Sequence, residues 1–424
     1  MTDRPSVEGS RRRILYLFLG LLLNVFLGTV YSWSVFRVPV EELFGVGAVA
    51  GGLPYMIMLA TFSLTLPVAG VLVDRLGLRK LATIGGLALA AAWLGGSFMP
   101  GIGGLTLVWG IVGGVGVGLA YVSSLTIGRV WFPERRGLAM GVVLSGFGMS
   151  PLVTAPLAEA ALLALGVRGT FRLVGVVFGV LIPLLVSPFR IPRPGELPSP
   201  KAGRSVETES QERGLAPSAA IRRREFIVLW VSLLLGSVIG LGAIAITAPY
   251  AQHVVGLSAP AAAVAVSFLA LFNGVGRPLF GFLTDHLGLR RTAVLAFSLT
   301  GAASLLLMVD PADGVVSFGV AFAVFWLLLG GWLAIAPAAT ATLFGSRHYG
   351  GNYGIVFQAY GLGAVAGTMV SGRLNEVFGS YRSVVTPILL VSIAGVLLAW
   401  WGFGRLSGAG VSNREPQGVG SDYT

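Results

Sequence analysis

The chain has 424 residues, of which 55% are hydrophobic and only 11% are charged. Soluble domains carry about 25% charged residues, so this composition excludes a soluble enzyme of this length. The net charge of +11 raises the question of nucleic acid, but most Lys and Arg lie in short breaks between apolar runs, which a membrane protein explains without a nucleic-acid site.

Twelve apolar stretches are long enough to cross a bilayer as helices, which takes about 20 residues each. After a cytoplasmic N-terminus at 1–13, the first six predicted spans are 14–36, 50–73, 81–99, 104–126, 138–161 and 170–188. The Pro-rich, charged segment 189–225 is a predicted flexible linker. The second six spans are 226–249, 259–283, 292–309, 315–336, 350–373 and 383–404, and a tail at 405–424 follows. We therefore predict an all-α membrane protein with two six-helix bundles, at 14–188 and 226–404.

The basic residues predict the orientation, because the cytoplasmic loops of membrane proteins carry an excess of Lys and Arg. If both termini are cytoplasmic, most of the 29 Lys and Arg fall in cytoplasmic segments, including the linker. The predicted outer breaks hold only Arg37, Arg168, Arg373 and Arg382. We therefore predict a multi-pass protein of the cell membrane (inner or plasma membrane), with both termini in the cytoplasm and membrane lipid around it.

One motif occurs twice, about half a chain apart. The segments Gly70 to Lys80 and Gly281 to Arg291 share the pattern Gly-x-x-x-Asp-x-Leu-Gly-Leu-Arg-basic. Six spans return the chain to the same side, so the two halves have parallel topology and are pseudo-symmetric. This arrangement is typical of a transporter whose two bundles rock around a central site.

The duplicated motif resembles the signature loop of the major facilitator superfamily, and the resemblance covers essentially the whole chain. We expect Asp74 and Asp285 to lie near the starts of the fifth and eleventh spans, whose positive dipole ends favour a carboxylate. Such contacts, together with basic residues of the same breaks, would form an inner gate. The predicted gate residues are Asp74, Arg75, Asp285, Arg135 and Arg136. The alternative is a pair of solvated turns whose charges only set the topology.

Two further segments narrow the class. The stretch Trp131 to Gly141, running on to Ser145-Gly-Phe-Gly148, resembles the fifth-helix signature of monocarboxylate transporters and the related oxalate/formate antiporters. Gly28 to Phe36 in the first span also resembles those antiporters. The resemblance implies transport of a small organic anion.

Arg277, within the eighth predicted span, is the first candidate for binding that anion. A charge at membrane depth costs roughly 2.5–3.5 kcal/mol on insertion scales and usually marks function. Glu159 is the only acidic residue inside a predicted span, and it falls near the outer end of the fifth span. A substrate carboxylate could instead pair with Arg277 through two parallel hydrogen bonds. The resembled families also carry an Arg here, and the alternative is an Arg held by backbone carbonyls.

Two departures from these families bear on the substrate. Asn273, one turn before Arg277, stands where many monocarboxylate transporters have an acidic residue, and an amide cannot carry a proton. Tyr360 stands in the eleventh span where the antiporters tend to have Lys. A single buried cation suits a monoanion better than oxalate.

The resemblance places further candidates on cavity-lining helices. Tyr31 and Tyr121 could bond the carboxylate or a hydroxy group, and Trp332 and Phe357 could form an apolar wall. His253, after the seventh span, is the one candidate proton site in the outer half, although an interfacial polar residue is the simpler explanation.

We therefore expect a monomeric secondary transporter of a small monocarboxylate such as L-lactate, coupled to a proton, without cofactor or metal. An oxalate/formate-type carboxylate antiporter is the alternative within the class, and a membrane ligand sensor on a transporter fold is the alternative outside it. An enzyme is not expected. The sequence has no Cys, no His-x-x-x-His pair, no Gly-x-Ser-x-Gly elbow and no phosphate-binding glycine loop followed by Lys.

Overall fold

The computed structural model describes residues 7–132, 136–192, 196, 214–310, 314–345 and 347–404. Within these ranges all regular structure is helical, apart from an isolated bridge between Gly214 and Gly345. The prediction of an all-α membrane protein is confirmed. Most of the predicted linker and the whole tail at 405–424 lie outside the described residues.

The described helices fall into two halves. The first half contains α1 (Val7–Leu27), the 3₁₀ turn η1 (Gly28–Ser32), α2 (Trp33–Phe44), α3 (Ala48–Leu76), α4 (Leu78–Gly96), α5 (Ile102–Leu105), the π-helical η2 (Thr106–Val112), α6 (Gly113–Trp131), α7 (Arg136–Met149) and α8 (Pro151–Val186). The second half contains α10 (Pro217–Ala220), α11 (Arg224–His253), α12 (Ala259–Leu287), α13 (Leu289–Val309), α14 (Val315–Phe344), α15 (Tyr349–Val356), α16 (Gln358–Phe378), the 3₁₀ turn η3 (Tyr381–Val384) and α17 (Val385–Gly404).

The described chain crosses the membrane twelve times. Ten helical stretches are long and apolar enough to span a bilayer. One of them, Leu138–Val186, makes two crossings, because the chain turns at Gly166, whose φ of 65° and ψ of 178° break the helix. The remaining crossing is the 19-residue α4, which packs against both α6 and α8.

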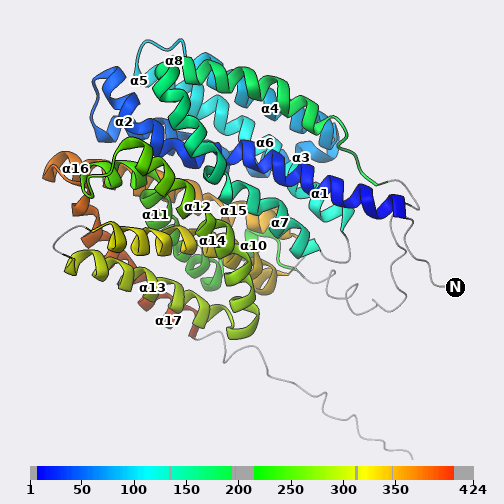
Figure 1. Ribbon diagram of the computed structural model, residues 1–424. Coiled ribbons are helices and arrows are strands. Elements are labelled where there is room, and N and C mark those ends of the chain that lie inside the picture. Colours follow the sequence, from blue (N-terminus) through cyan, green and yellow to red (C-terminus); the bar gives the residue numbers. More distant parts are fainter. Residues whose placement is uncertain are drawn as a thin grey trace, which may run out of the picture.

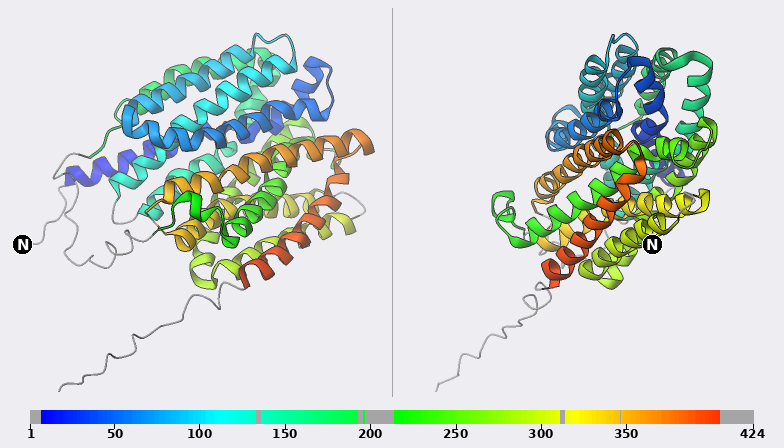
Figure 2. Two further views of the ribbon diagram at one scale, coloured as in Figure 1. Left: turned by 180° about the vertical axis from the view of Figure 1, so that it is seen from behind. Right: turned by 90° about the vertical axis from the view of Figure 1, so that its left-hand side faces the viewer.

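The two halves pack against each other as two layers of helices (Figures 1 and 2). Successive crossings alternate in direction, so the connections gather at two opposite ends of the molecule. We call the end with the loops at Gly77 and Gly288 the basic end. The opposite end, with the loops at Gly45 and Gly379, is called the distal end.

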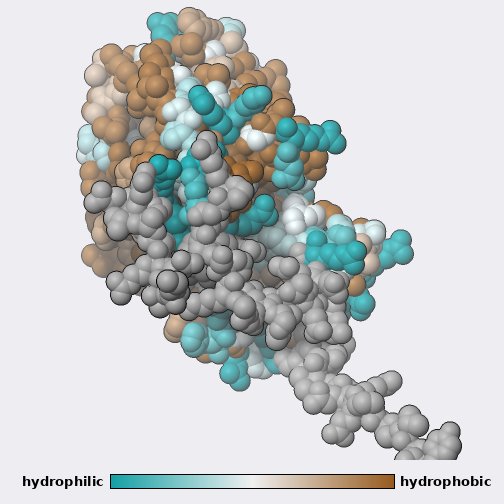
Figure 3. All heavy atoms as spheres, turned by 90° about the vertical axis from the view of Figure 1, so that its right-hand side faces the viewer, coloured by the Kyte–Doolittle hydropathy of each residue, from teal (hydrophilic) through white to brown (hydrophobic). Residues whose placement is uncertain are grey.

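The surface of the molecule is apolar on its flanks and hydrophilic at the basic end. Large apolar side chains such as Leu157, Leu163 and Val316 are exposed on the flanks, where lipid would cover them. Viewed from the basic end, hydrophilic side chains gather on the face between these flanks (Figure 3). Exposed basic residues at this end are Arg12, Arg75, Arg79, Lys80, Arg129, Arg222, Arg223, Arg224, Arg291 and Arg347.

The two copies of the repeated motif adopt the same backbone turn. Gly77 connects α3 to α4 with φ 78° and ψ 159°, and Gly288 connects α12 to α13 with φ 77° and ψ 160°. A positive φ is strained for residues with a Cβ, so glycine is needed at both turns. The sequence repeat therefore corresponds to a structural repeat.

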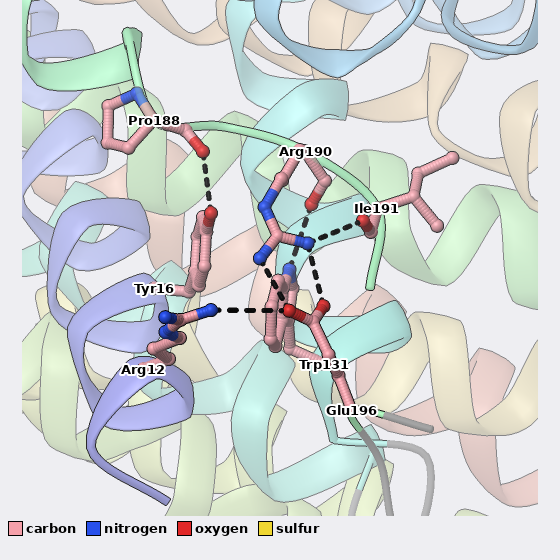
Figure 4. A network of polar contacts seen from close by, with 7 residues as sticks. All are labelled: Arg12, Tyr16, Trp131, Pro188, Arg190, Ile191 and Glu196. Carbon is pink, nitrogen blue, oxygen red and sulfur yellow. Dashed lines mark hydrogen bonds and ion pairs between the residues drawn. The ribbon is translucent and has the colours of Figure 1, made fainter. Parts of the chain in front are cut away.

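The segment after α8 is held against the first half by the polar network in Figure 4. The Arg190 guanidinium donates two hydrogen bonds of 2.7 Å to the Glu196 carboxylate, and Arg12 of α1 pairs with the same carboxylate at 3.4 Å. Tyr16 of α1 donates to the Pro188 carbonyl at 2.6 Å, and the Trp131 indole donates to the Arg190 carbonyl at 2.9 Å. This network fixes the start of the predicted linker at the basic end.

Helices α12 and α14 approach so closely that their backbones touch. A Cβ at Gly330 of α14 would overlap the Asn273 carbonyl, and a Cβ at Gly276 of α12 would overlap the Leu327 carbonyl. Small residues allow this approach between membrane helices. The contact fixes the part of α12 that carries Asn273 and Arg277.

We expect Gly330→Ala to destabilise the protein by about 1–3 kcal/mol, because the added methyl forces α14 away from α12. Gly319→Ala is the matched control, since it lies on the same helix and its Cβ would meet nothing within 4 Å. Thermal unfolding in detergent measures both variants. Equal midpoints for the two would contradict the close-packing interpretation.

Candidate substrate site

Two tyrosine hydroxyls join the halves of the protein. Tyr31 lies in η1 of the first half and Tyr360 in α16 of the second, and their Oη atoms are 2.6 Å apart. Both side chains are buried. The predicted span 14–36 is interrupted at η1, and Tyr31 lies within this 3₁₀ turn. The structure therefore brings together two predicted site residues that are far apart in the sequence.

Aromatic rings from both halves surround this pair. Tyr121 of α6 packs edge-on against Phe62 of α3 and Phe147 of α7, with ring centroids 5.1 and 5.7 Å apart. Phe357 stacks on Tyr360 at 4.8 Å. Tyr121 and Phe357, two of the residues predicted to line the cavity, thus lie around the Tyr31–Tyr360 pair. Phe62 and Phe147 were missed, although Phe147 lies in the Ser145 to Gly148 motif.

Arg277 of α12 is buried beside this group, with 5% of its surface exposed. Its Nη1 donates to the Leu144 carbonyl of α7 at 2.7 Å. One backbone carbonyl therefore holds Arg277, which is part of the alternative in which backbone carbonyls, and not a substrate, bind this side chain. In the described part of the chain no carboxylate pairs with it. The hydroxyl groups of Tyr31, Tyr121 and Tyr353 lie near it. The site thus combines one positive charge with several hydroxyl groups.

Asn273 lies one turn from Arg277 on the same helix and is fully buried. Its Nδ2 donates to the Trp326 carbonyl of α14 at 3.1 Å, while its Oδ1 has no hydrogen-bond partner. Because Nδ2 needs the Trp326 carbonyl, the amide is fixed with Oδ1 directed toward α7, at Gly148.

Two of the predicted residues lie elsewhere. Trp332 packs against Phe297 of α13, with ring centroids 5.0 Å apart, and against Gly236 of α11. It belongs to the interior of the second half. His253 is exposed at the distal end of α11, and its ring centroid is 6.4 Å from that of Tyr381.

The predicted gate residues lie at the basic end. Asp74, Arg75 and Asp285 are exposed, and within the described ranges neither aspartate forms an ion pair. Arg135 and the side chain of Arg136 lie outside what the structure describes. Asp74, Arg75 and Asp285 are therefore solvent-accessible.

At the distal end the two halves are sealed together by Arg37, which is fully buried. Its guanidinium pairs with Glu41 at 2.9 Å and donates to the Ala48 carbonyl at 2.6 Å within the first half. It also donates to the Ala245 carbonyl of α11 at 3.1 Å, and it lies 5.4 Å from the centre of the Tyr381 ring. The prediction that Arg37 lies in an outer break is wrong, because Arg37 lies inside α2, which continues to Phe44.

A second contact supports this seal. The Glu376 carboxylate of α16 accepts a hydrogen bond of 2.9 Å from the backbone N–H of Val49, in the first turn of α3. The described hydrogen bonds between the halves therefore extend from the distal end as far as Arg277. This arrangement closes the site to the distal side.

Comparisons with known proteins agree with this architecture. The family model of the Major Facilitator Superfamily matches residues 17–266 and again 235–419. The chain belongs to the major facilitator superfamily. A superfamily structure with the same fold is a bacterial homologue of the human lysosomal transporter Spinster, in an inward-facing and unoccupied conformation. It has a TM-score of 0.72 and 17% identity, and the match covers 93% of this chain and 98% of that one.

Curated relatives within the major facilitator superfamily include carriers of small organic anions. The oxalate:formate antiporter of Oxalobacter formigenes is 28% identical, with 87% of this chain and 86% of the relative covered. Monocarboxylate transporter 12 of Mus musculus is 24% identical, with 75% and 70% covered. This superfamily protein is thus a membrane transporter and not an enzyme. Within the described residues, no cluster of His, Asp and Glu could hold a metal ion.

Proposed function

We propose that the protein is a secondary active transporter of a small monocarboxylate such as L-lactate, working by alternating access. The observation that carries this proposal is Arg277, a guanidinium buried between the two halves without a carboxylate partner among the described residues. A buried cation of this kind favours an anionic ligand, and the ring of tyrosine hydroxyls offers further hydrogen bonds.

A monoanion fits this site better than a dianion. Among the described residues Arg277 is the one cation beside the tyrosine pair, and Tyr360 contributes a hydroxyl where oxalate/formate antiporters tend to have Lys. A carboxylate bound to Arg277 would cancel its charge, and the halves could then rock with a neutral site. An oxalate/formate-type exchanger, supported by the relative from Oxalobacter formigenes, remains the alternative.

A proton is proposed to accompany the anion. Net entry of a lone anion is opposed by the membrane potential by about 2.3 kcal/mol per charge per 100 mV. Asn273 cannot carry this proton. His253 is exposed at the distal end, which we place outside, and it is the proposed proton site.

We place the basic end and both termini in the cytoplasm, because the exposed Arg and Lys gather there. We further propose that the protein works as a monomer in the cell membrane. Asp74, Arg75, Asp285, Arg135 and Arg136 would form the inner gate, and the Arg37 contacts would form the outer seal. In this orientation the Arg37 seal faces the outside of the cell.

The test is uptake of radiolabelled substrates by proteoliposomes that contain the purified protein. We expect L-lactate uptake to rise with an inwardly directed proton gradient and to be competed by other monocarboxylates. Exchange of internal oxalate for external formate, without lactate uptake, would favour the antiporter instead. Binding of lactate without any transport would favour the ligand sensor.

A further inference from the structure

Gly148, the last residue of the Ser145 to Gly148 motif, lies where α7 of the first half crosses α12 of the second. A Cβ at Gly148 would overlap Oδ1 of Asn273 and would lie 3.4 Å from Nε of Arg277. In the same way, a Cβ at Gly274 of α12 would overlap the side chain of the neighbouring Met149. The two helices can therefore approach this closely only because both crossing points are glycine.

This crossing leaves two buried polar atoms without a hydrogen-bond partner, Oδ1 of Asn273 and Nε of Arg277. An unpaired buried polar group destabilises a structure, and an unpaired charged group does so more strongly. Asn273 cannot turn to relieve this cost, because its Nδ2 is held by the Trp326 carbonyl. The two unpaired atoms therefore offset part of the stability that close packing of α7 against α12 provides.

The buried Nε limits how a carboxylate can bind. A carboxylate takes two parallel hydrogen bonds from a guanidinium either through both Nη atoms or through Nε and one Nη. The second mode requires α7 to move away from α12, since Nε is enclosed beside Gly148.

We propose that the anion binds Arg277 through Nε, so that its binding separates α7 from α12 at Gly148 and thereby moves the two halves. The inference rests on the proposed function, because it takes Arg277 as the residue that binds the anion. The carboxylate supplies the acceptor that Nε lacks, and α7 moves away together with the Leu144 carbonyl. The only hydrogen bond described between α7 and α12 is then lost. Gly148 is a positioning residue in this scheme, since it acts through Asn273 and Arg277.

The test measures the separation of α7 and α12 directly. The chain has no Cys, so spin labels can be attached only at introduced cysteines. Leu138 of α7 and Phe282 of α12 are both exposed, and Leu138→Cys with Phe282→Cys reports the helix separation by double electron–electron resonance in nanodiscs. We expect Gly148→Ala to lengthen this distance without any anion, because the methyl group displaces α7 from Asn273.

Gly141→Ala is the matched control, since it lies on the same helix and its Cβ would meet nothing within 4 Å. Adding Asn273→Ala to Gly148→Ala removes the atom that the methyl would overlap, so the distance should return toward the wild-type value. This rescue separates the proposed contact from general misfolding. A distance for Gly148→Ala that coincides with that of Gly141→Ala would overturn the proposal.

The second comparison measures the same distance with and without L-lactate at a saturating concentration. We expect L-lactate to lengthen the wild-type distance and to change the Gly148→Ala distance little. If lactate is transported but leaves the wild-type distance unchanged, anion binding does not act through this crossing and the proposal is wrong. An absence of transport of any monocarboxylate would instead refute the proposed function, while the Gly148→Ala comparison would still decide whether this crossing sets the helix separation.

Discussion

Arg277→Ala is expected to abolish monocarboxylate uptake while leaving the protein folded. Truncating one partner of a buried, hydrogen-bonded charge pair costs about 2–5 kcal/mol, which corresponds to a loss of roughly 30-fold or more in affinity. The guanidinium is also the group that the anion must neutralise before the halves move. Initial rates of L-lactate uptake into proteoliposomes, with size-exclusion profiles of the purified protein, measure both effects.

Arg291→Ala is the control for this experiment, because Arg291 is exposed at the start of α13 and lies outside the site. Arg277→Lys keeps the charge but loses the fork geometry, so we expect only part of the activity to return. Uptake by Arg277→Ala at the rate of Arg291→Ala would remove Arg277 from the mechanism.

Arg37→Met is expected to cause the largest loss of stability among single changes at the distal end. The substitution removes hydrogen bonds to Glu41, Ala48 and Ala245 and leaves the Glu41 carboxylate without its partner. Removing one member of a buried ion pair costs about 3–5 kcal/mol. We therefore expect a clearly lower unfolding midpoint in detergent and a distal end that opens more readily.

Arg373→Met provides the comparison, since the Arg373 side chain is 70% exposed and pairs with Glu376 only at 3.5 Å. Exposed pairs of this kind contribute about 0–1 kcal/mol. Adding Glu41→Gln to Arg37→Met should recover part of the stability, because it removes the unpaired charge. An unfolding midpoint for Arg37→Met equal to that of Arg373→Met would show that Arg37 does not seal the distal end.

The membrane fold and its repeat could be predicted because they depend on local signals. Hydropathy over about 20 residues marks a crossing wherever the lipid, and not a particular partner, decides the structure. The repeated motif was readable for the same reason, since Gly77 and Gly288 each make a local turn with positive φ. Arg277 stood out because a charge inside an apolar run needs no structural context to be unusual.

The partners of these residues could not be predicted, because they come from distant parts of the chain. Arg37 precedes Pro39, Glu41 and Glu42, and its local sequence reads as a polar break. Its burial depends on Ala245 and Tyr381, which lie in the other half. Nothing local distinguishes buried charges that join helices from charges that face water.

For the same reason, the sequence could not show which aromatic residues line the site. Phe62 contacts Tyr121, Phe357 and Tyr360, yet in the sequence it is one of 24 Phe. Trp332 was assigned to the cavity from the helix that carries it, but the direction of a side chain around a buried helix is set by packing. In α14 both faces are apolar, so periodicity gives no signal for which one faces the site.

The most direct test of the central claim is a cryo-electron microscopy structure of the protein with L-lactate. We predict that the lactate carboxylate lies within hydrogen-bonding distance of the Arg277 guanidinium, with its other atoms against Tyr31, Tyr121 and Tyr360. Lactate bound elsewhere, with Arg277 still donating to the Leu144 carbonyl, would contradict the assignment of Arg277 as the residue that binds the anion.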